Sequence, residues 1–184
     1  MNKLVSFACT AAIAPSIFAQ TEGWLPNSDL PRVASDGGSG AGTAIGALTT
    51  WDPDGDGPLG RCLVVAGGLN MQVANAASVA YFDGDWHGLG AALSSSGGIY
   101  NCIAYREPNS QYEQIFATTG QGGLFRFTNG SWVQLNNCTS GKAMIVADLD
   151  GDGPQPPKLL VGGFCGVTVW DGISSTQLTA CSSC

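Results

Sequence analysis

A pattern of short apolar runs and tight turns returns three times, at intervals of about 45 residues, and constrains this chain more than any other feature. Each copy has two apolar runs, then a run in which aromatic side chains recur, then a turn and a last short run. The copies end at equivalent leucines, Leu89, Leu135 and Leu178. Short runs rich in Val, Ile and Leu predict β-strands, and a fixed repeat predicts an architecture of stacked units.

The turn before the last run has the same chemistry in all three copies. It is Asp83–Gly84 in the first, Asn129–Gly130 in the second and Asp171–Gly172 in the third. Asp-Gly and Asn-Gly adopt the positive φ angles of a two-residue type I′ hairpin more easily than other pairs. We therefore predict that the third and fourth strands of every copy are joined by such a hairpin.

A four-stranded antiparallel unit of this length, repeated in tandem, is typical of a β-propeller blade. The sequence therefore predicts an all-β fold with three propeller-type blades within 47–184, at about 47–90, 101–136 and 143–179. Propellers usually close with roughly four to eight blades, so three blades form an incomplete propeller. A fragment of a longer propeller, a homo-oligomer in which a second copy completes the ring, and an open stack are all compatible with the sequence.

The order of glycines and aromatic residues resembles known propeller repeats. Glycine doublets follow the second strand at Gly67–Gly68 and Gly162–Gly163, an aromatic residue follows in the third strand, and Trp86 or Trp132 in the fourth. This order resembles the kelch repeat. The acidic turn that precedes an apolar strand ending in Gly-Gly-Phe is more similar to the FG-GAP repeat of integrin-type propellers. The resemblance covers residues 47–178 and implies a kelch-like or FG-GAP-like repeat protein.

Residues 1–19 have the form of a secretory signal peptide, with a positive start at Lys3, an apolar stretch and a small residue, Ala19, at the junction. This predicts export to a secreted, periplasmic or cell-surface location. Residues 20–46 then combine a partial strand with a glycine-rich linker. No later segment approaches the ~20 consecutive apolar residues of a membrane span, so we expect none.

The composition limits the classes of partner. The chain carries 14 acidic and 7 basic residues, which gives a net charge of −7. A protein that binds nucleic acid non-specifically needs the opposite sign, so we expect no nucleic-acid partner. A hydrophobic content of 44% argues against a disordered chain.

The cysteines suggest disulfides if the chain is exported. Beyond the signal peptide they are Cys62, Cys102, Cys138, Cys165, Cys181 and Cys184. An even number in an exported chain is compatible with a disulfide framework. Cys138 precedes the first strand of the third blade and Cys165 follows its second strand, so both lie at one edge and a bridge between them is possible. Other pairings stay open, and Cys62 is expected to be free or to pair between chains.

The chemically sharpest motif is a run of alternating aspartates after the first strand of the first and third blades. These residues are Asp52, Asp54 and Asp56, and Asp148, Asp150 and Asp152. Alternating carboxylates followed by glycine match the start of a calcium-binding loop. The later ligands are missing, since Leu63 and Leu159 stand where an EF-hand has glutamate. Two hypotheses therefore stay open: weak Ca²⁺ sites, or turns in which Asp, Gly and Pro serve only the backbone.

Residues typical of catalysis are few. His87 is the one histidine, so no multi-histidine metal centre can form within the chain. Glu107 and Glu113 flank the first hairpin of the second blade, but their spacing does not establish the carboxylate pair of a glycosidase. The sequence therefore predicts a non-enzymatic binding or scaffold protein with a protein or glycan ligand. The alternative is a non-catalytic or incomplete part of a secreted carbohydrate-active propeller enzyme.

Overall fold

The computed structural model describes residues 45–67, 78–91, 93, 98–120, 122–136, 141–163 and 166–178. All of them belong to one of the two units into which the chain divides, Pro31–Cys184. The predicted signal peptide and nearly all of the predicted linker at 20–46 lie outside the described residues. Among the described residues, no helix has the length and apolar composition needed to cross a membrane.

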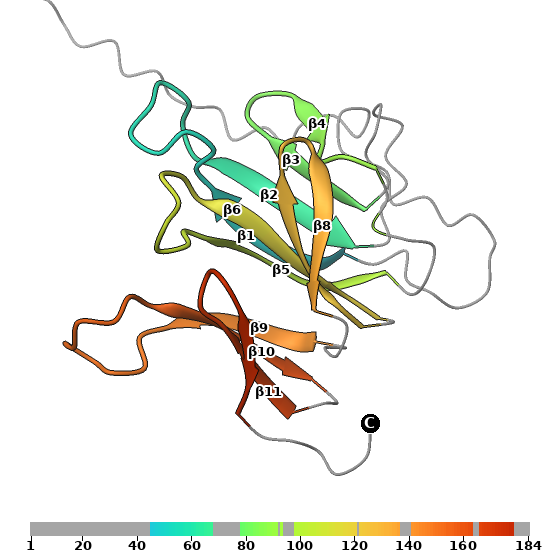
Figure 1. Ribbon diagram of the computed structural model, residues 1–184. Coiled ribbons are helices and arrows are strands. Elements are labelled where there is room, and N and C mark those ends of the chain that lie inside the picture. Colours follow the sequence, from blue (N-terminus) through green and yellow to red (C-terminus); the bar gives the residue numbers. More distant parts are fainter. Residues whose placement is uncertain are drawn as a thin grey trace, which may run out of the picture. The chain divides into compact units, whose positions relative to one another are not determined.

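The described part of the chain forms twelve β-strands in three four-stranded sheets (Figure 1). The first sheet contains β1 (Ile45–Trp51), β2 (Cys62–Gly67), β3 (Val79–Phe82) and β4 (Trp86–Gly88). The second contains β5 (Ile99–Tyr105), β6 (Gln114–Thr119), β7 (Leu124–Thr128) and β8 (Ser131–Asn136). The third contains β9 (Gly141–Ala147), β10 (Lys158–Gly163), β11 (Gly166–Trp170) and β12 (Ser175–Gln177).

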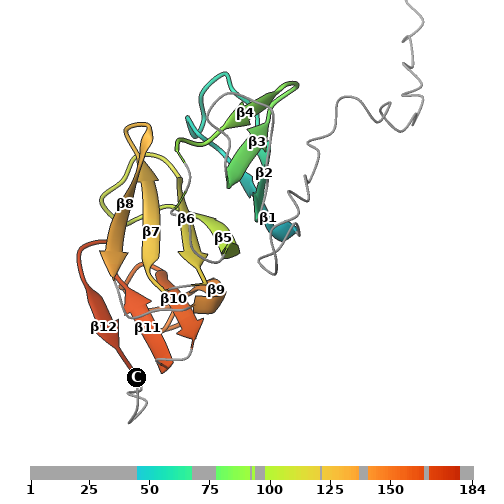
Figure 2. The same cartoon turned by 90° about the vertical axis from the view of Figure 1, so that its right-hand side faces the viewer.

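Every sheet is an antiparallel meander, because strands that follow one another in sequence are hydrogen-bonded neighbours. Figure 2 shows this order in the third sheet, where β9, β10, β11 and β12 lie side by side. The predicted all-β fold with three four-stranded units is thereby confirmed. No sheet among the described residues closes on itself, so the propeller-type arrangement is incomplete.

The hairpin prediction is correct for the second sheet. Asn129 and Gly130 both adopt positive φ angles, 51° and 76°, and Thr128 pairs directly with Ser131. A two-residue loop with two positive φ angles is a type I′ turn, whose twist matches that of the flanking strands.

In the first and third sheets the predicted two-residue hairpin is wrong. Three residues separate the paired ends of β3 and β4, and four separate those of β11 and β12. The Asp171 carboxylate accepts the backbone N–H groups of Ile173 at 2.8 Å and Ser174 at 2.7 Å, and Asp83 accepts that of Asp85 at 3.3 Å. An aspartate that bonds the backbone of its own turn stabilises a longer turn, so only the glycine after it adopts positive φ.

The second sheet is buried on both faces. Successive side chains of a strand point to opposite faces, so β6 sends Ile115 to one side and Phe116 to the other. Ile115 packs with Val64 of the first sheet in one hydrophobic core. Phe116 packs with Leu159 and Val161 of the third sheet in a second core. The three sheets are therefore stacked through two apolar interfaces.

Candidate functional site

A polar cavity of about 490 Å³ lies between loop 52–61, which joins β1 to β2, and loop 106–113, which joins β5 to β6. Each loop follows the first strand of its sheet, and β1 and β5 are neighbours, so the two loops meet. Three of the predicted metal ligands, Asp52, Asp54 and Asp56, line the cavity. Because charged side chains of both signs gather here, this cavity is the candidate functional site.

Loop 52–61 is shaped by its second aspartate. Asp54 Oδ2 accepts the backbone N–H of Leu59 at 3.0 Å and so closes the loop. Gly55 has a φ of 66°, a conformation that favours glycine. A Cβ on Gly57 would overlap the Asp54 carboxylate. The Asp-Gly-Asp-Gly spacing of the motif is therefore explained by the backbone of the loop.

Loop 148–157, between β9 and β10, repeats this internal geometry. Asp150 Oδ2 accepts the backbone N–H of Gln155 at 3.1 Å, Gly151 has a φ of 67°, and a Cβ on Gly153 would overlap the Asp150 carboxylate. The hydrogen bond from Gln155 lowers the pKa of Asp150 below its ordinary value. Asp148 in turn accepts the Asp150 backbone N–H at 3.2 Å. The two acidic motifs are thus repeats in structure as well as in sequence.

The six aspartates do not converge on metal positions in the structure. Within the described ranges, no three His, Cys, Asp or Glu side chains are grouped so that they could hold a metal ion. Asp54 and Asp150 close their loops instead, and Asp56 and Asp152 are exposed. These contacts fit the turn hypothesis, and Ca²⁺ binding stays a prediction.

Two carboxylate oxygens at the cavity lack partners. Asp52 Oδ1 and Asp54 Oδ1 are shielded from solvent, and neither accepts a hydrogen bond from the part of the chain that the structure describes. A buried acceptor without a donor costs free energy that a suitable donor would recover. Both atoms therefore have acceptor capacity that the described chain does not use, and their shielding keeps them from contact with a ligand in this conformation.

Glu113 ties the acidic loop to the second sheet. Its Oε2 accepts the backbone N–H of Asp52 at 3.0 Å, and its Oε1 pairs with Nη2 of Arg61 at 2.6 Å. The Trp51 indole N–H donates to the Glu113 backbone carbonyl at 3.0 Å. The wall of the cavity is therefore a set of polar contacts between two sheets.

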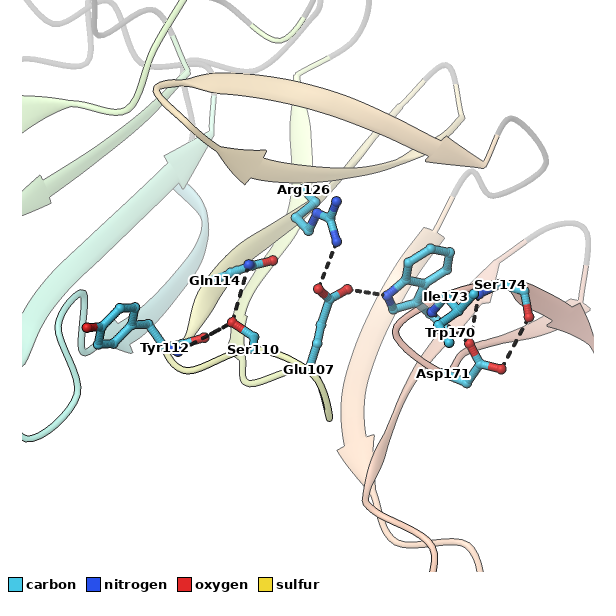
Figure 3. A network of polar contacts seen from close by, with 9 residues as sticks. All are labelled: Glu107, Ser110, Tyr112, Gln114, Arg126, Trp170, Asp171, Ile173 and Ser174. Carbon is cyan, nitrogen blue, oxygen red and sulfur yellow. Dashed lines mark hydrogen bonds and ion pairs between the residues drawn. The ribbon is translucent and has the colours of Figure 1, made fainter.

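Glu107, at the start of the same loop, makes a separate buried contact (Figure 3). Its Oε2 accepts from Nη1 of Arg126 at 2.7 Å, and its Oε1 accepts from the indole N–H of Trp170 at 2.7 Å. Glu107 is only 6% exposed. Because Trp170 belongs to the third sheet, this carboxylate joins the second sheet to the third.

Tyr112 forms the aromatic side of the cavity. The Ser110 hydroxyl donates to the Tyr112 carbonyl at 2.7 Å, and Gln114 donates to the same hydroxyl at 3.4 Å (Figure 3). These bonds hold the loop, while the Tyr112 side chain stays 41% exposed. A Cβ on Gly55 would lie 3.5 Å from the Tyr112 ring, so the ring borders the acidic loop.

The basic and aromatic half of the cavity was missed at the level of sequence. It consists of Arg61, Arg106 and Tyr112. The repeat pattern contained the information needed to predict it, because loops that follow the first strands of consecutive blades lie side by side. The charges of loop 106–113 therefore belong with the acidic motif of the preceding repeat.

The other reactive groups within the described ranges lie apart from this cavity or are buried. His87 Nε2 lies 3.0 Å from Asp83 Oδ1, and its ring stacks on Tyr81. Cys62 and Cys102 are free thiols in the first core, and burial raises the pKa of both, that of Cys102 to about 12. A thiol held protonated is a poor nucleophile.

The disulfide prediction cannot be compared with the structure, because Cys138 and Cys165 lie outside the described residues.

Comparisons of the chain with family models, with curated proteins and with solved structures found no match. The kelch-like and FG-GAP-like resemblance of the repeats therefore remains a prediction, and function has to be argued from the cavity itself.

Proposed function

We propose that this chain is an exported, non-enzymatic, propeller-type binding protein of the kelch-like or FG-GAP-like kind, and that its ligand at the cavity is a glycan. One observation carries the proposal: aspartate and arginine residues and an exposed aromatic ring line a single cavity. The volume of about 490 Å³ falls within the roughly 300–1,000 Å³ of small-molecule sites.

A glycan suits this set of groups because each sugar hydroxyl both donates and accepts hydrogen bonds. The aspartates that line the cavity, of which Asp56 is exposed, offer acceptors, and Arg61 and Arg106 offer donors. The exposed Tyr112 ring offers an apolar surface with a polar tip, which suits the C–H face of a sugar ring. The acidic surroundings disfavour an anionic ligand.

The contacts of the two glutamates support a binding role over catalysis. Glu107 is buried and accepts two hydrogen bonds, and Glu113 is paired with Arg61 and bonded to Asp52. Both carboxylates are thus engaged by donors of the chain itself. The alternative is a non-catalytic or incomplete part of a carbohydrate-active propeller enzyme. It has the same glycan ligand, but the whole protein would then also cleave the glycan.

Export is the part of the proposal that rests on residues 1–19. Cleavage after Ala19 leaves a chain that begins at Gln20 and reaches a compartment in which Cys138 and Cys165 can form a disulfide. Intact-mass analysis of protein from the native host is expected to give a chain starting at Gln20. A full-length chain starting at Met1 in the cytosol contradicts export.

The binding test is titration of the purified chain with a panel of neutral oligosaccharides, followed by calorimetry on those that bind. We expect Tyr112→Ala and Asp52→Asn each to weaken binding by roughly tenfold, since each removes one contact with the sugar. Asp148→Asn is the matched control, because it alters the equivalent motif in the third sheet. Its affinity is expected to equal that of the unmodified chain.

Three results contradict parts of the proposal. Absence of binding to every oligosaccharide, or binding that Tyr112→Ala and Asp52→Asn leave unchanged, excludes a glycan in this cavity and leaves a protein ligand. Release of shorter sugars during the incubation, detected by mass, favours the enzyme alternative.

A further inference from the structure

The contact between the first and second sheets uses a leucine from one sheet and an aromatic pair from the other. Leu89, which follows β4, is 3% exposed and belongs to the core between the sheets. Trp132 packs against this core and donates its indole N–H to the Leu89 carbonyl at 2.8 Å. Phe127 lies beside Trp132, with ring centroids 5.3 Å apart.

The contact between the second and third sheets repeats this arrangement in part. Leu135, at the end of β8, packs against the core that contains Leu159 and Trp170 of the third sheet. Trp170 is the last residue of β11, and Phe127 is the last but one of β7. Trp170 is therefore the aromatic residue of this second contact, as Phe127 is of the first. In both contacts, the leucine comes from the earlier sheet and the aromatic residue from the later one.

The outward face of the first sheet is the face that points away from the second sheet. It carries an aromatic pair, Phe82 and Trp86, at the positions that Phe127 and Trp132 hold in the second sheet. Its apolar side chains are Leu48, Leu63, Val65, Ala80, Phe82 and Trp86. Val65 and Ala80 are already buried, at 4% and 0% exposed, so the open part of the face is the part around Leu48 and Leu63. Leu63 pairs with Phe82 and Phe82 with Trp86 across the strands, and these residues alternate with those that enter the core. The ring centroids of Phe82 and Trp86 lie 5.1 Å apart, close to the 5.3 Å between those of Phe127 and Trp132 in the second sheet. Leu48 and Leu63 are 60% and 41% exposed.

The outward face of the third sheet is the face that points away from the second sheet. It carries Leu178, the counterpart of Leu89. The backbone N–H of Leu178 donates to the Val167 carbonyl at 2.8 Å, just as that of Leu89 donates to Val79 at 2.9 Å. The two leucines therefore hold the same place in their sheets. Leu89 is buried, whereas Leu178 is 57% exposed, and Ile145 on the same face is 59% exposed.

We propose that two copies of this chain join head to tail, with the outward face of the third sheet in each copy packed on the outward face of the first sheet in the other. Leu178 then lies against Phe82 and Trp86 as Leu89 lies against Phe127 and Trp132. The occupant is a second copy because the chain carries both halves of a contact that it already forms internally.

The geometry of repeats sets the number of copies. A contact between two different faces of one chain either closes into a ring or continues as a filament. The described residues of two copies supply six sheets, which falls within the roughly four to eight blades of closed propellers, whereas those of three copies supply nine. Two copies are therefore the expected closed state. This inference does not depend on the ligand of the cavity.

The test is sedimentation velocity of the full chain under reducing conditions, so that cysteines cannot link the copies. The unmodified chain is expected at twice the mass of one chain. Leu178→Glu and Leu63→Glu are each expected to raise the dissociation constant roughly tenfold or more, because each places a charge in an apolar contact. Both side chains are well exposed, so neither change empties a core.

A mixing experiment separates this arrangement from pairing of like faces. When the Leu178→Glu and Leu63→Glu chains are mixed, one of the two contacts has no altered residue, so a dimer of one chain of each kind is expected. Pairing of like faces gives no such recovery. Ile173→Glu is the control, because Ile173 is 76% exposed but lies in the β11–β12 turn, and it is expected to leave the dimer intact.

Three outcomes overturn the proposal. The first is a single-chain mass at all concentrations, which is expected if further repeats of a longer chain cover these faces. The second is a dimer that Leu178→Glu and Leu63→Glu leave unchanged. The third is mixed variants that stay monomeric while the Ile173→Glu chain forms dimers.

Discussion

Besides the two apolar cores, the second sheet makes a polar contact with each neighbour at the two ends of one loop, and these two contacts are built differently. At the end of loop 106–113, Glu113 pairs with Arg61 at the first sheet, and the two side chains are 22% and 53% exposed. At its start, Glu107 pairs with Arg126 and bonds Trp170 of the third sheet, and its side chain is 7% exposed. The ion pairs are 2.6 and 2.7 Å long, so burial rather than distance distinguishes them.

This difference in burial separates a structural contact from an adjustable one. A buried carboxylate has lost its hydration and depends on its donors, so removal of a partner is costly. A solvent-facing ion pair contributes little, because water can replace either partner. The Glu107 contact therefore holds two sheets together, while the Glu113 contact beside the cavity can rearrange at little cost in free energy.

The largest expected effect is that of Glu107→Ala. This change leaves Arg126 and the Trp170 indole without their acceptor, and it is expected to lower the free energy of unfolding by about 2–3 kcal/mol. Glu113→Ala removes the exposed pair and is expected to cost about 0.5–1 kcal/mol. Urea unfolding measures both values, and equal losses would show that burial does not separate the two contacts.

A cation bound by loop 52–61, the loop that Glu113 contacts, would stabilise the folded chain. If the carboxylates of loop 52–61 bind Ca²⁺ with a dissociation constant of ~1 mM, ~10 mM Ca²⁺ raises the free energy of unfolding by about 1.4 kcal/mol. Asp54→Asn keeps an acceptor for the Leu59 N–H but removes a charge, so it is expected to remove much of this gain. Asp150→Asn is the matched change in the third sheet.

Thermal unfolding at constant ionic strength provides the measurement, with EDTA as the reference and Mg²⁺ as the control. Mg²⁺ is expected to act more weakly, because it requires strict octahedral geometry. The same melting temperature in EDTA and in Ca²⁺ would establish both acidic loops as turns only.

A single hydrogen bond also joins the second sheet to the third: Tyr105 donates its hydroxyl to the Pro157 carbonyl of the third sheet at 2.7 Å. Tyr105→Phe is expected to cost about 1 kcal/mol at neutral pH. Burial, with the nearby charges of Glu107 and Asp171, raises the pKa of Tyr105. The folded chain therefore holds this proton more tightly than the unfolded chain does.

The sign of the pH dependence follows from that shift. The contribution of Tyr105 is complete below the unfolded pKa of about 10 and is lost as pH rises through the folded value. Urea unfolding between neutral and alkaline pH is expected to show a steeper loss for the unmodified chain than for Tyr105→Phe. Parallel curves would contradict a role for the Tyr105 proton in the contact with the third sheet.

The hairpins show how far local sequence can predict structure. All three were expected to be type I′ turns, yet only the Asn129–Gly130 turn has that form. The Asp171 side chain stabilises a longer turn by bonding two backbone N–H groups that follow it. Asn and Asp have similar preferences for positive φ, and the sequence does not show which backbone groups their side chains will bond.

The sequence by itself determined the strands, their order within each sheet and the shape of the acidic loops, because these depend on contacts between residues close together in the chain. The tertiary structure alone decided that Glu107 is buried while Glu113 borders a cavity, and that Leu89 is covered while Leu178 is not. The two glutamates have the same side chain and the two leucines end equivalent repeats. What differs is the neighbouring sheet, and burial depends on which sheet packs against a residue.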